Sequence, residues 1–593
     1  MAPLKLTENA RKVLKARYLR RDRKGRVMET PEELFRTVSR GVAYAEHVLN
    51  RGRQASHWEE KYHNLLTSLD FLPNTPTLMN AGKPIGQLSA CFVLPVEDSM
   101  ERIFEAVKQM ALVQSTGGGT GFSFSRLRPK GEMVSTTTGE ASGPVSFMKI
   151  FDCATENIKQ GGKRRGANMG ILRVDHPDIL EFVTSKRDGV SLRNFNLSVG
   201  VTDAFMEACR EETDYELINP VQGRSAGRIS ASQVFHEIVE SAWETGDPGL
   251  IFLDTINRSN PTPHIGVIEA TNPCGEIPLL PYESCNLGSI NLAHMLHREG
   301  VEPEIDWEKL RQVTREGVRF LDDVIEVGRY PVPEIERMTR GNRKIGLGVM
   351  GFAEMLIRLR IPYDSDEAVS MAGRIMKFIS QEADQTSEEL AAERGAFPNW
   401  KGSIYESRGI RMRNATRLAI APTGTIGIIA GTSAGIEPLF ALAYKRSHVL
   451  NGQTLFEMNP VFMEYLDRYG LEARRITEEV LEKGRLKDVE GVPEELKRLF
   501  VTALEIPPER HLQIQVAFQR YVDNSVSKTI NLPHEATIQD IARIYFRAWE
   551  LGLKGITIYR YGSKSAQVLE LGLGEEALHY DHAARCDPEE CRV

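Results

Sequence analysis

The stretch Asn272-Pro273-Cys274-Gly275-Glu276-Ile277-Pro278 places one thiol between an amide and a carboxylate, each two residues away. In an extended segment, residues two apart share a face, so Asn272, Cys274 and Glu276 are expected to point the same way. Pro273 and Gly275 disfavour a helix here. The pattern predicts a stiff loop with Cys274 at its tip. A turn around a buried structural cysteine is the alternative, because free cysteine usually behaves as a small hydrophobe.

The composition is that of a globular protein. The 593 residues suffice for several domains or for one large enzyme core with additions. Apolar residues make up 41% of the chain and charged residues 26%, which are ordinary values. The net charge of −7 argues against a protein that binds nucleic acid. The basic run from Arg11 to Arg26 is interpreted as a solvated helix face.

The cysteines and the N-terminus indicate a reducing compartment. The N-terminus, MAPLKLTENARKVLKARYLRR, has no apolar signal segment, and no apolar run is long enough to cross a bilayer. We therefore expect a cytoplasmic protein without membrane contact. The cysteines are Cys91, Cys153, Cys209, Cys274, Cys285, Cys586 and Cys591. Their odd number argues against a disulfide framework, and the lack of a CxxC pair argues against a zinc ribbon. We predict no metal site and consider reactive thiols the stronger hypothesis.

Hydrophobic periodicity predicts a mixture of helices and short strands. Residues 1–70 indicate a charged helical region, and residues 470–510 a charged helical insertion. Amphipathic helices are expected at 232–245, 308–328, 365–392 and 537–551. Strands are expected in LSACFVLP (88–95), ESCNLGSINL (283–292), LAIA (418–421) and GITIYRYG (555–562).

Three loops have the composition of anion-binding segments. The run STGGGTG at 115–121, followed by Lys130, allows backbone N–H groups to approach a phosphate, although it matches no standard nucleotide motif. The cluster Lys163-Arg164-Arg165 lies between glycines and fits either an anion-contacting loop or a solvated helix end. The strand before Pro422-Thr423-Gly424-Thr425 and the apolar run after it are typical of a phosphate-binding turn, with an ordinary capped helix as the alternative.

Several motifs together resemble the catalytic chain of ribonucleotide reductases. They are NPCGEIPL, LSACFVLP, SCNLGSINL and APTGTIGIIAGTSAGIEP, supported by TPTLMNAG, GLGVMGFAEML and VDNSVSKTINLP. The resemblance implies a ten-stranded α/β barrel over residues 71–570, with a central finger loop that carries the radical cysteine, after the N-terminal helical region. It also implies specificity and dimer elements at about 98–170 and a flexible redox tail at 571–593.

The resemblance implies thiyl-radical chemistry on a ribonucleoside diphosphate. Cys274 would become the thiyl radical that removes the 3′-hydrogen. Glu276 would act as base on the 3′-hydroxyl, and Asn272 would orient the substrate hydroxyls. Cys91 and Cys285 would supply a proton and two electrons and become a disulfide. That disulfide requires their Cα atoms to lie within about 7 Å.

The resemblance also implies the surrounding binding sites. The substrate would contact Thr75, Thr77, Ser89, Thr423, Gly424, Thr425 and Ile426. A dNTP or ATP effector would contact Asp98, Lys130, Lys163, Arg164 and Arg165, although Asp98 or Ser99 also fits a helix N-cap. Cys586 and Cys591 would re-reduce the inner pair by thiol–disulfide exchange and receive electrons from a thioredoxin-like reductant. A homodimer is expected, without an ATP-cone activity site.

The radical source follows from what the motifs lack. The segment Tyr559-Arg560-Tyr561 contains no adjacent tyrosine pair for a relay from a second subunit, and no glycyl-radical motif is present. The resemblance is therefore to the adenosylcobalamin-dependent class, although no D-x-H-x-x-G motif is found. One alternative is the large subunit of a two-component reductase. Another is a catalytically silent nucleotide-binding regulator, against which the five family cysteines argue.

Overall fold

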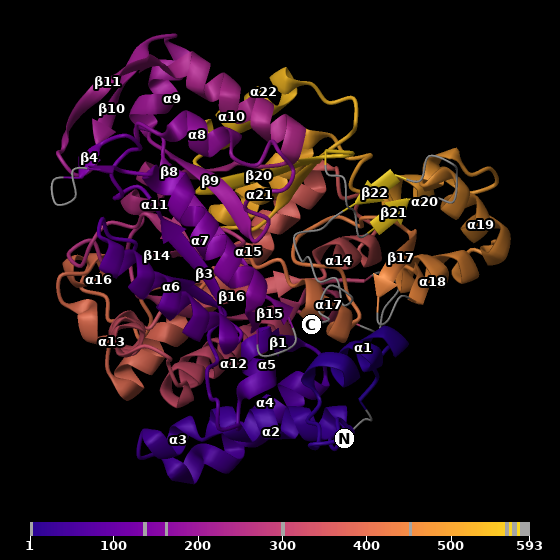
Figure 1. The fold of residues 1–593 in the computed structure, drawn as a ribbon. Coiled ribbons are helices and arrows are strands. Elements are labelled where there is room, and N and C mark those ends of the chain that lie inside the picture. Colours follow the sequence, from indigo (N-terminus) through magenta and orange to yellow (C-terminus); the bar gives the residue numbers. More distant parts are fainter. Residues whose placement is uncertain are drawn as a thin grey trace.

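The computed structural model describes residues 4–134, 139–160, 164–297, 303–449, 453–563, 569–571 and 578–580. The N-terminal region consists of the helices α1 (Glu8–Val13), α2 (Pro31–Ala43), α3 (Ala45–Val48) and α4 (Ala55–Thr67), with a π-turn at Leu14–Tyr18. These helices lie at one end of the molecule (Figure 1). Thr30 and Glu33 form a capping box that begins α2.

The central sheet contains ten strands, of which β1 only borders β15 and the other nine belong to the predicted barrel. They are β1 (Phe71–Pro73), β2 (Cys91–Val93), β3 (Gly119–Ser123), β8 (Asn168–Arg173), β9 (Phe195–Val201), β12 (Gly249–Phe252), β15 (Ser284–Asn291), β16 (Ile345–Met350), β19 (Thr529–Leu532) and β20 (Gly555–Arg560). The strands β2-β3-β8-β9-β12 are mutually parallel, as are β15 with β16 and β19 with β20. The two groups meet through antiparallel pairs, β15 with β2 and β12 with β20.

Backbone hydrogen bonds close this sheet into a ring. Beside β16, the Ala419 N–H donates to the Leu347 carbonyl (3.0 Å), and the Ile420 N–H donates to the Ser525 carbonyl (3.2 Å). Residues 524–527 then continue into β19. The residues around 418–420 thereby join β16 to β19 and complete a ring of two antiparallel halves. The expected ten-stranded α/β barrel is confirmed.

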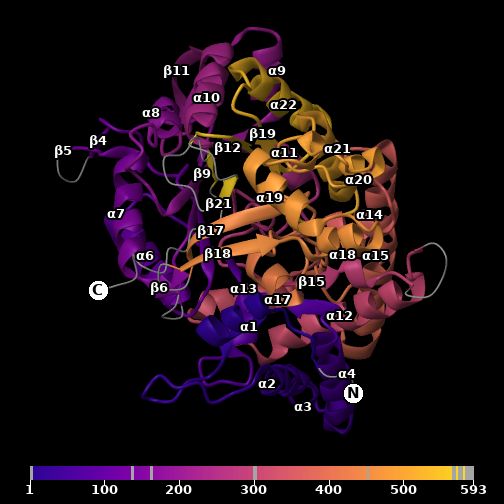
Figure 2. The same cartoon turned by 90° about the vertical axis from the view of Figure 1, so that its right-hand side faces the viewer.

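Long helices cover the outside of the barrel (Figure 2). They are α6 (Met100–Ser115), α7 (Gly143–Asn157), α10 (Ala231–Thr245), α12 (Trp307–Val327), α15 (Asp366–Arg394), α21 (Pro508–Gln519) and α22 (Ile538–Glu550). The expected amphipathic helices are confirmed, with ends that differ by at most a few residues. Shorter helices are α5 (Thr75–Asn80), α8 (Ile179–Thr184), α9 (Asp203–Arg210), α11 (Leu253–Arg258), α13 (Pro333–Asn342), α14 (Phe352–Arg358), α16 (Ile404–Ser407), α17 (Gly424–Ala430), α18 (Pro460–Arg468), α19 (Ala473–Lys483) and α20 (Glu494–Leu499).

A buried ion cluster joins the N-terminal helices to the barrel. Arg394 of α15 lies 2.7 Å from Glu46 of α3, 2.9 Å from Asp322 and 2.6 Å from Asp323 of α12. A buried carboxylate is costly unless a cation compensates it. The cluster therefore fixes α3 against the outer helices of the barrel.

A small separate sheet lies beside α18 and α19 (Figure 1). Its order is β18-β17-β21-β22, from β17 (Ala443–Val449), β18 (Gln453–Met458), β21 (Leu569–Leu571) and β22 (Leu578–Tyr580). Of the predicted tail 571–593, the structure describes residue 571 and residues 578–580, which belong to these strands. Cys586 and Cys591 lie outside the described residues.

Candidate active site

The central motif forms a hairpin. Strands β13 (Ala270–Thr271) and β14 (Pro278–Leu279) pair antiparallel, and the motif connects them. The Ile277 N–H donates to Asn272 Oδ1 (2.9 Å), and the Gly275 N–H donates to the Asn272 carbonyl (3.1 Å). Gly275 has φ +82°, a conformation that favours glycine. The side chain and backbone of Asn272 therefore both close the loop.

Barrel strands contact this hairpin from several sides. A Cβ on Gly121 of β3 would lie 1.7 Å from the Thr271 carbonyl oxygen, so only glycine permits this approach. Asn196 Nδ2 of β9 donates to the Pro273 carbonyl (2.8 Å). From the other half of the ring, the Ser525 N–H donates to the Glu276 carbonyl (2.8 Å). The hairpin thus lies inside the barrel, as expected for a finger loop.

The loop differs from the extended segment that the alternation argument assumed. It turns at Pro273 and Cys274 and bends at Gly275 and Glu276. Asn272 and Glu276 are buried, each 2% exposed, whereas Cys274 is exposed. The expectation of an extended segment is wrong, because the positive φ of Gly275 bends the chain within the motif.

Two buried thiols face each other beside the finger loop. Cys91 of β2 and Cys285 of β15 are register partners in an antiparallel pairing. Residues directly opposite in such a pair have Cα atoms roughly 4.5–5.5 Å apart, which lies within disulfide reach. Asn272 Nδ2 donates to Cys91 Sγ (3.1 Å). Sequence positions 91, 272 and 285 therefore meet at one point.

Burial determines the protonation of these thiols. It raises the pKa of Cys91 well above the usual range, and the nearby Glu276, Cys285 and Cys274 raise it further. Burial also raises the pKa of Cys285, against the opposing effect of Lys344. Both sulfurs are therefore thiols at neutral pH, which is the form that can donate a proton.

The Glu276 carboxyl group differs from the two thiols, because its raised pKa lies near neutral pH. Burial raises its pKa to about 7, partly opposed by hydrogen bonding from the Asn272 side chain. Its Oε2 is buried without a hydrogen-bond partner in the part of the chain that the structure describes. A carboxyl group with this pKa exchanges protons near neutral pH and suits a general base.

The predicted phosphate turn begins α17. Thr423 is its N-cap residue with φ +53°, and its Oγ1 accepts a hydrogen bond from the Gly435 N–H (2.6 Å). A Cβ on Gly424 would meet no atom within 4 Å, and Gly424 is exposed. Thr425 is half-buried, whereas Ile426 is buried. The turn therefore has an open side at Gly424.

The other predicted substrate residues lie around β1 and β2. The Thr77 hydroxyl is fully buried and bonds to Asn74 Oδ1 (2.6 Å) and the Leu88 carbonyl (3.0 Å). Ser89 accepts a hydrogen bond from Ser284, the neighbour of Cys285 (3.2 Å). Thr75 is half-buried at the start of α5.

Comparison with known proteins agrees with this geometry. Residues 89–559 match the family model described as ribonucleotide reductase, barrel domain, and residues 4–86 match ribonucleotide reductase, all-alpha domain. The chain belongs to the ribonucleotide reductase family. The resemblance inferred from its motifs is confirmed.

Individual ribonucleotide reductases are similar over most of their length. A "Vitamin B12-dependent ribonucleoside-diphosphate reductase" of Thermoplasma acidophilum is 50% identical over 96% of this chain and 81% of that protein. The protein of the same name from Mycobacterium tuberculosis is 51% identical over 95% and 81%. Among solved structures, the alpha subunit of the Actinobacillus ureae class Id ribonucleotide reductase has a TM-score of 0.76 at 25% identity, covering 95% of this chain and 99% of that one.

Two of the predicted effector residues, Asp98 and Lys130, form ion pairs within the protein. Asp98 pairs with Arg128 (2.7 Å), and Lys130 pairs with Glu181 (3.1 Å). Of the two alternatives for the N-cap of α6, Ser99 is the one observed. Arg164 and Arg165 form strand β7, whose side chains are not described, and Lys163 lies outside the described residues.

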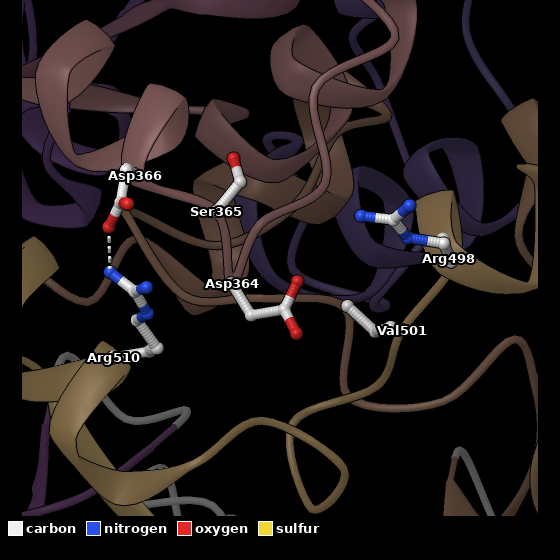
Figure 3. Close-up of a pocket in the computed structure, with 6 residues that line it drawn as sticks. All are labelled: Asp364, Ser365, Asp366, Arg498, Val501 and Arg510. Carbon is white, nitrogen blue, oxygen red and sulfur yellow. Dashed lines mark hydrogen bonds and ion pairs between the residues drawn. The ribbon is translucent and has the colours of Figure 1, made fainter.

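A surface pocket of about 310 Å³ lies outside the reductase barrel (Figure 3). Its lining consists of Asp364, Ser365, Asp366, Arg498, Val501 and Arg510. Arg510 and Asp366 form an ion pair across it (2.5 Å). It contains none of the predicted site residues, so the candidate active site remains the finger loop.

The described ranges lack a metal-binding cluster and a membrane-spanning helix. They contain no group of three or more His, Cys, Asp or Glu residues placed to hold a metal ion. No helix within them is long and apolar enough to cross a membrane.

Several residues at the site were not predicted from the sequence. Asn196, which holds Pro273, and Tyr18, whose hydroxyl lies 2.8 Å from Thr75 Oγ1, belong to no motif. The Tyr18 contact spans 57 residues of chain. No local pattern reports such a contact.

Proposed function

We propose that the chain is a ribonucleoside-diphosphate reductase that uses adenosylcobalamin as its radical source. The observation that carries the proposal is the buried pair Cys91 and Cys285 in register beside the finger loop, with Asn272 bonded to Cys91. The relatives named vitamin B12-dependent ribonucleoside-diphosphate reductase, which are 50% and 51% identical, support both the substrate class and the cofactor.

Reduction begins at the ribose C3′. The 2′-hydroxyl is a poor leaving group, and a radical at C3′ makes its departure feasible. Cys274, as a thiyl radical, takes the 3′-hydrogen atom, and Glu276 accepts the proton of the 3′-hydroxyl. Its pKa of about 7 supports this role. Asn272 orients the substrate hydroxyls from the base of the same loop.

The inner thiols complete the reduction. One of them protonates the 2′-hydroxyl, which leaves as water, and the other supplies the hydrogen that replaces it at C2′, while Glu276 returns its proton to the 3′-oxygen. Cys91 and Cys285 together supply two electrons, so that two S–H bonds break and one S–S bond forms. Cys274 then returns the hydrogen atom to C3′ and recovers its radical. The burial that keeps both inner sulfurs protonated supports this step.

The surroundings of Cys274 fit a large cofactor. Its side chain is exposed, and a Cβ on the adjacent Gly275 would meet no atom within 4 Å. Adenosylcobalamin, when bound beside Cys274, would supply the carbon-centred radical that oxidises this thiol. Cys274 has the exposure that hydrogen transfer to such a radical requires.

We place the substrate diphosphate at the open side of the α17 turn. Thr423, Gly424, Thr425 and Ile426 offer hydroxyl and backbone donors there, and Thr75 and Ser89 extend the site toward the thiols. Thr77 stabilises the segment between Thr75 and Ser89, because its hydroxyl bonds to Asn74 and to the Leu88 carbonyl.

The remaining assignments complete the proposal. A dNTP or ATP effector binds near Asp98, Lys130, Lys163, Arg164 and Arg165, at a homodimer interface formed by residues 98–170. The proposed domains are the helical region 1–70, the barrel domain 71–570, which includes an insertion at 470–510, and the redox tail 571–593. Cys586 and Cys591 pass electrons from a thioredoxin-like reductant, and the enzyme acts in the cytoplasm.

The test is deoxycytidine diphosphate formation by the purified chain with dithiothreitol and a dATP or ATP effector. We expect product only when adenosylcobalamin is added. Product that appears only with a separate metal-containing subunit would support the two-component alternative. Nucleotide binding without product under either condition would support the silent regulator.

A further inference from the structure

Tyr18 brings the N-terminal helical region into contact with the substrate site. Its side chain is 1% exposed, and its hydroxyl lies 2.8 Å from Thr75 Oγ1. Tyr18 ends a π-turn that the Leu19 N–H closes by donating to the Leu14 carbonyl (3.0 Å). Single π-turns are rare and frequently occur at functional sites.

The same segment also packs against α17, the helix that follows the phosphate turn. Helix α1, directly before the π-turn, contacts α17 (Figure 1). The Thr7 Cγ2 atom lies 3.4 Å from where a Cβ on Gly431, the C-cap of α17, would be. Helix α17 in turn contacts β1, which ends two residues before Thr75. Residues 7–18 therefore contact both Thr75 and α17, the two elements that contribute to the proposed diphosphate site.

We propose that Tyr18 is a positioning residue that orients the Thr75 hydroxyl toward an oxygen of the substrate diphosphate. This inference rests on the function proposed above. A hydroxyl group has one proton and two lone pairs. When the Tyr18 phenol donates to Thr75 Oγ1, the Thr75 proton is available to another acceptor. Because Thr75 is half-buried, a bound phosphate oxygen can reach that proton.

The test is a double-mutant cycle with Tyr18→Phe, Thr75→Val and the double variant. Each variant removes one hydroxyl and keeps the shape of the side chain. For cytidine diphosphate we measure KM, kcat and the equilibrium Kd. A single hydrogen bond corresponds to an about two- to tenfold change in affinity. We expect Y18F to raise KM and Kd by this factor and to leave kcat within about twofold.

A matched control separates positioning from general stability. Tyr465 is also buried, and its hydroxyl donates to the Ile357 carbonyl (2.9 Å), a contact with neither Thr75 nor α17. We expect Tyr465→Phe to lower the unfolding temperature as much as Y18F does and to leave KM and Kd unchanged.

The cycle distinguishes the possible outcomes. If Tyr18 acts through Thr75, Y18F has no further effect in the T75V background. The proposal would be overturned if KM and Kd were unchanged in Y18F. It would also be overturned if the fold-changes of the two single variants multiplied in the double variant. If the wild type itself showed no turnover, that result would instead count against the proposed function. In that case the Kd cycle still decides the role of Tyr18.

Discussion

Cys91 and Cys285 are opposite partners in the antiparallel pairing of β2 and β15. They lie far apart in the sequence, yet no backbone movement is needed to bring their Cα atoms within disulfide distance. The finger loop reaches this pair through Asn272, whose amide bonds to Cys91. The two paired thiols and the finger loop therefore form one connected site.

Oxidation in a single turnover should form one particular disulfide. In a variant with Cys586→Ser and Cys591→Ser, whose tail cannot re-reduce the inner pair, we expect substrate and adenosylcobalamin without external reductant to join Cys91 to Cys285, because these thiols face each other. Peptide mapping measures the bond. Cys209 serves as the internal control, because it is buried and burial raises its pKa to about 12. A disulfide that includes Cys209, or an unchanged pair after product has formed, would contradict the assignment.

The radical role predicts a complete loss of turnover in Cys274→Ser. A serine hydroxyl holds its hydrogen too strongly to form the corresponding radical, so we expect no deoxynucleotide and an unchanged nucleotide Kd. The matched control is Cys153→Ser in α7, another exposed cysteine, which should retain activity. Residual deoxynucleotide formation by C274S would falsify the role.

The raised pKa of Glu276 leads to a prediction for the pH dependence of the reaction. Burial raises its pKa to about 7, and the base must be deprotonated to accept the 3′-hydroxyl proton. We expect kcat/KM to rise about tenfold per pH unit below this value and to level off above it. Glu276→Gln should lose most activity together with this limb of the profile. A limb that persists in E276Q would assign it to another group.

The same shift predicts an effect on stability. Folding raises the Glu276 pKa from 4.5 to about 7, so the folded state binds the proton more tightly. The corresponding stability is present below pH 4.5 and is lost as pH rises to about 7. Between pH 5 and pH 8, the free energy of unfolding of E276Q should rise relative to that of the wild type by at most about 3 kcal/mol. Thermal unfolding at several pH values measures this difference. A gap that is independent of pH would contradict this expectation.

Gly121 should be intolerant of any side chain. Alanine there would place its Cβ against the Thr271 carbonyl and displace the finger hairpin. We expect Gly121→Ala to reduce turnover at least tenfold and to cost about 1–3 kcal/mol of stability, the range for overpacking. The control is Gly373→Ala in α15, where no atom lies within 4 Å of the new Cβ. Equal activities of the two variants would argue against a positioned hairpin.

The C-terminal thiols predict a defect confined to recycling. We expect the double variant Cys586→Ser and Cys591→Ser to complete one turnover and to continue with dithiothreitol, which reaches the inner pair directly. Turnover with a thioredoxin-like reductant should fall to background. Failure of even the first turnover would show that the tail has a different task.

Local patterns predicted the elements better than their contacts. The amphipathic helices and the strand around Cys285 appear where periodicity placed them, because burial of an apolar face acts within one element. The barrel itself was expected only from resemblance to a family. Its closure depends on the pairing of residues 418–420 with residues 347 and 525, and a strand pattern does not specify its pairing partners.

At the site, the sequence alone determined which residues are candidates for the chemistry: the Asn272-Cys274-Glu276 motif and the cysteines at 91 and 285. Local rules misjudged their arrangement, because alternation assumed an extended chain where Gly275 turns it. Only the tertiary structure decided that Cys91 faces Cys285, that Tyr18 reaches Thr75, and that Glu276 has a pKa near 7. The physical reason is that pairing and desolvation arise between segments distant in sequence, and a linear pattern records neither.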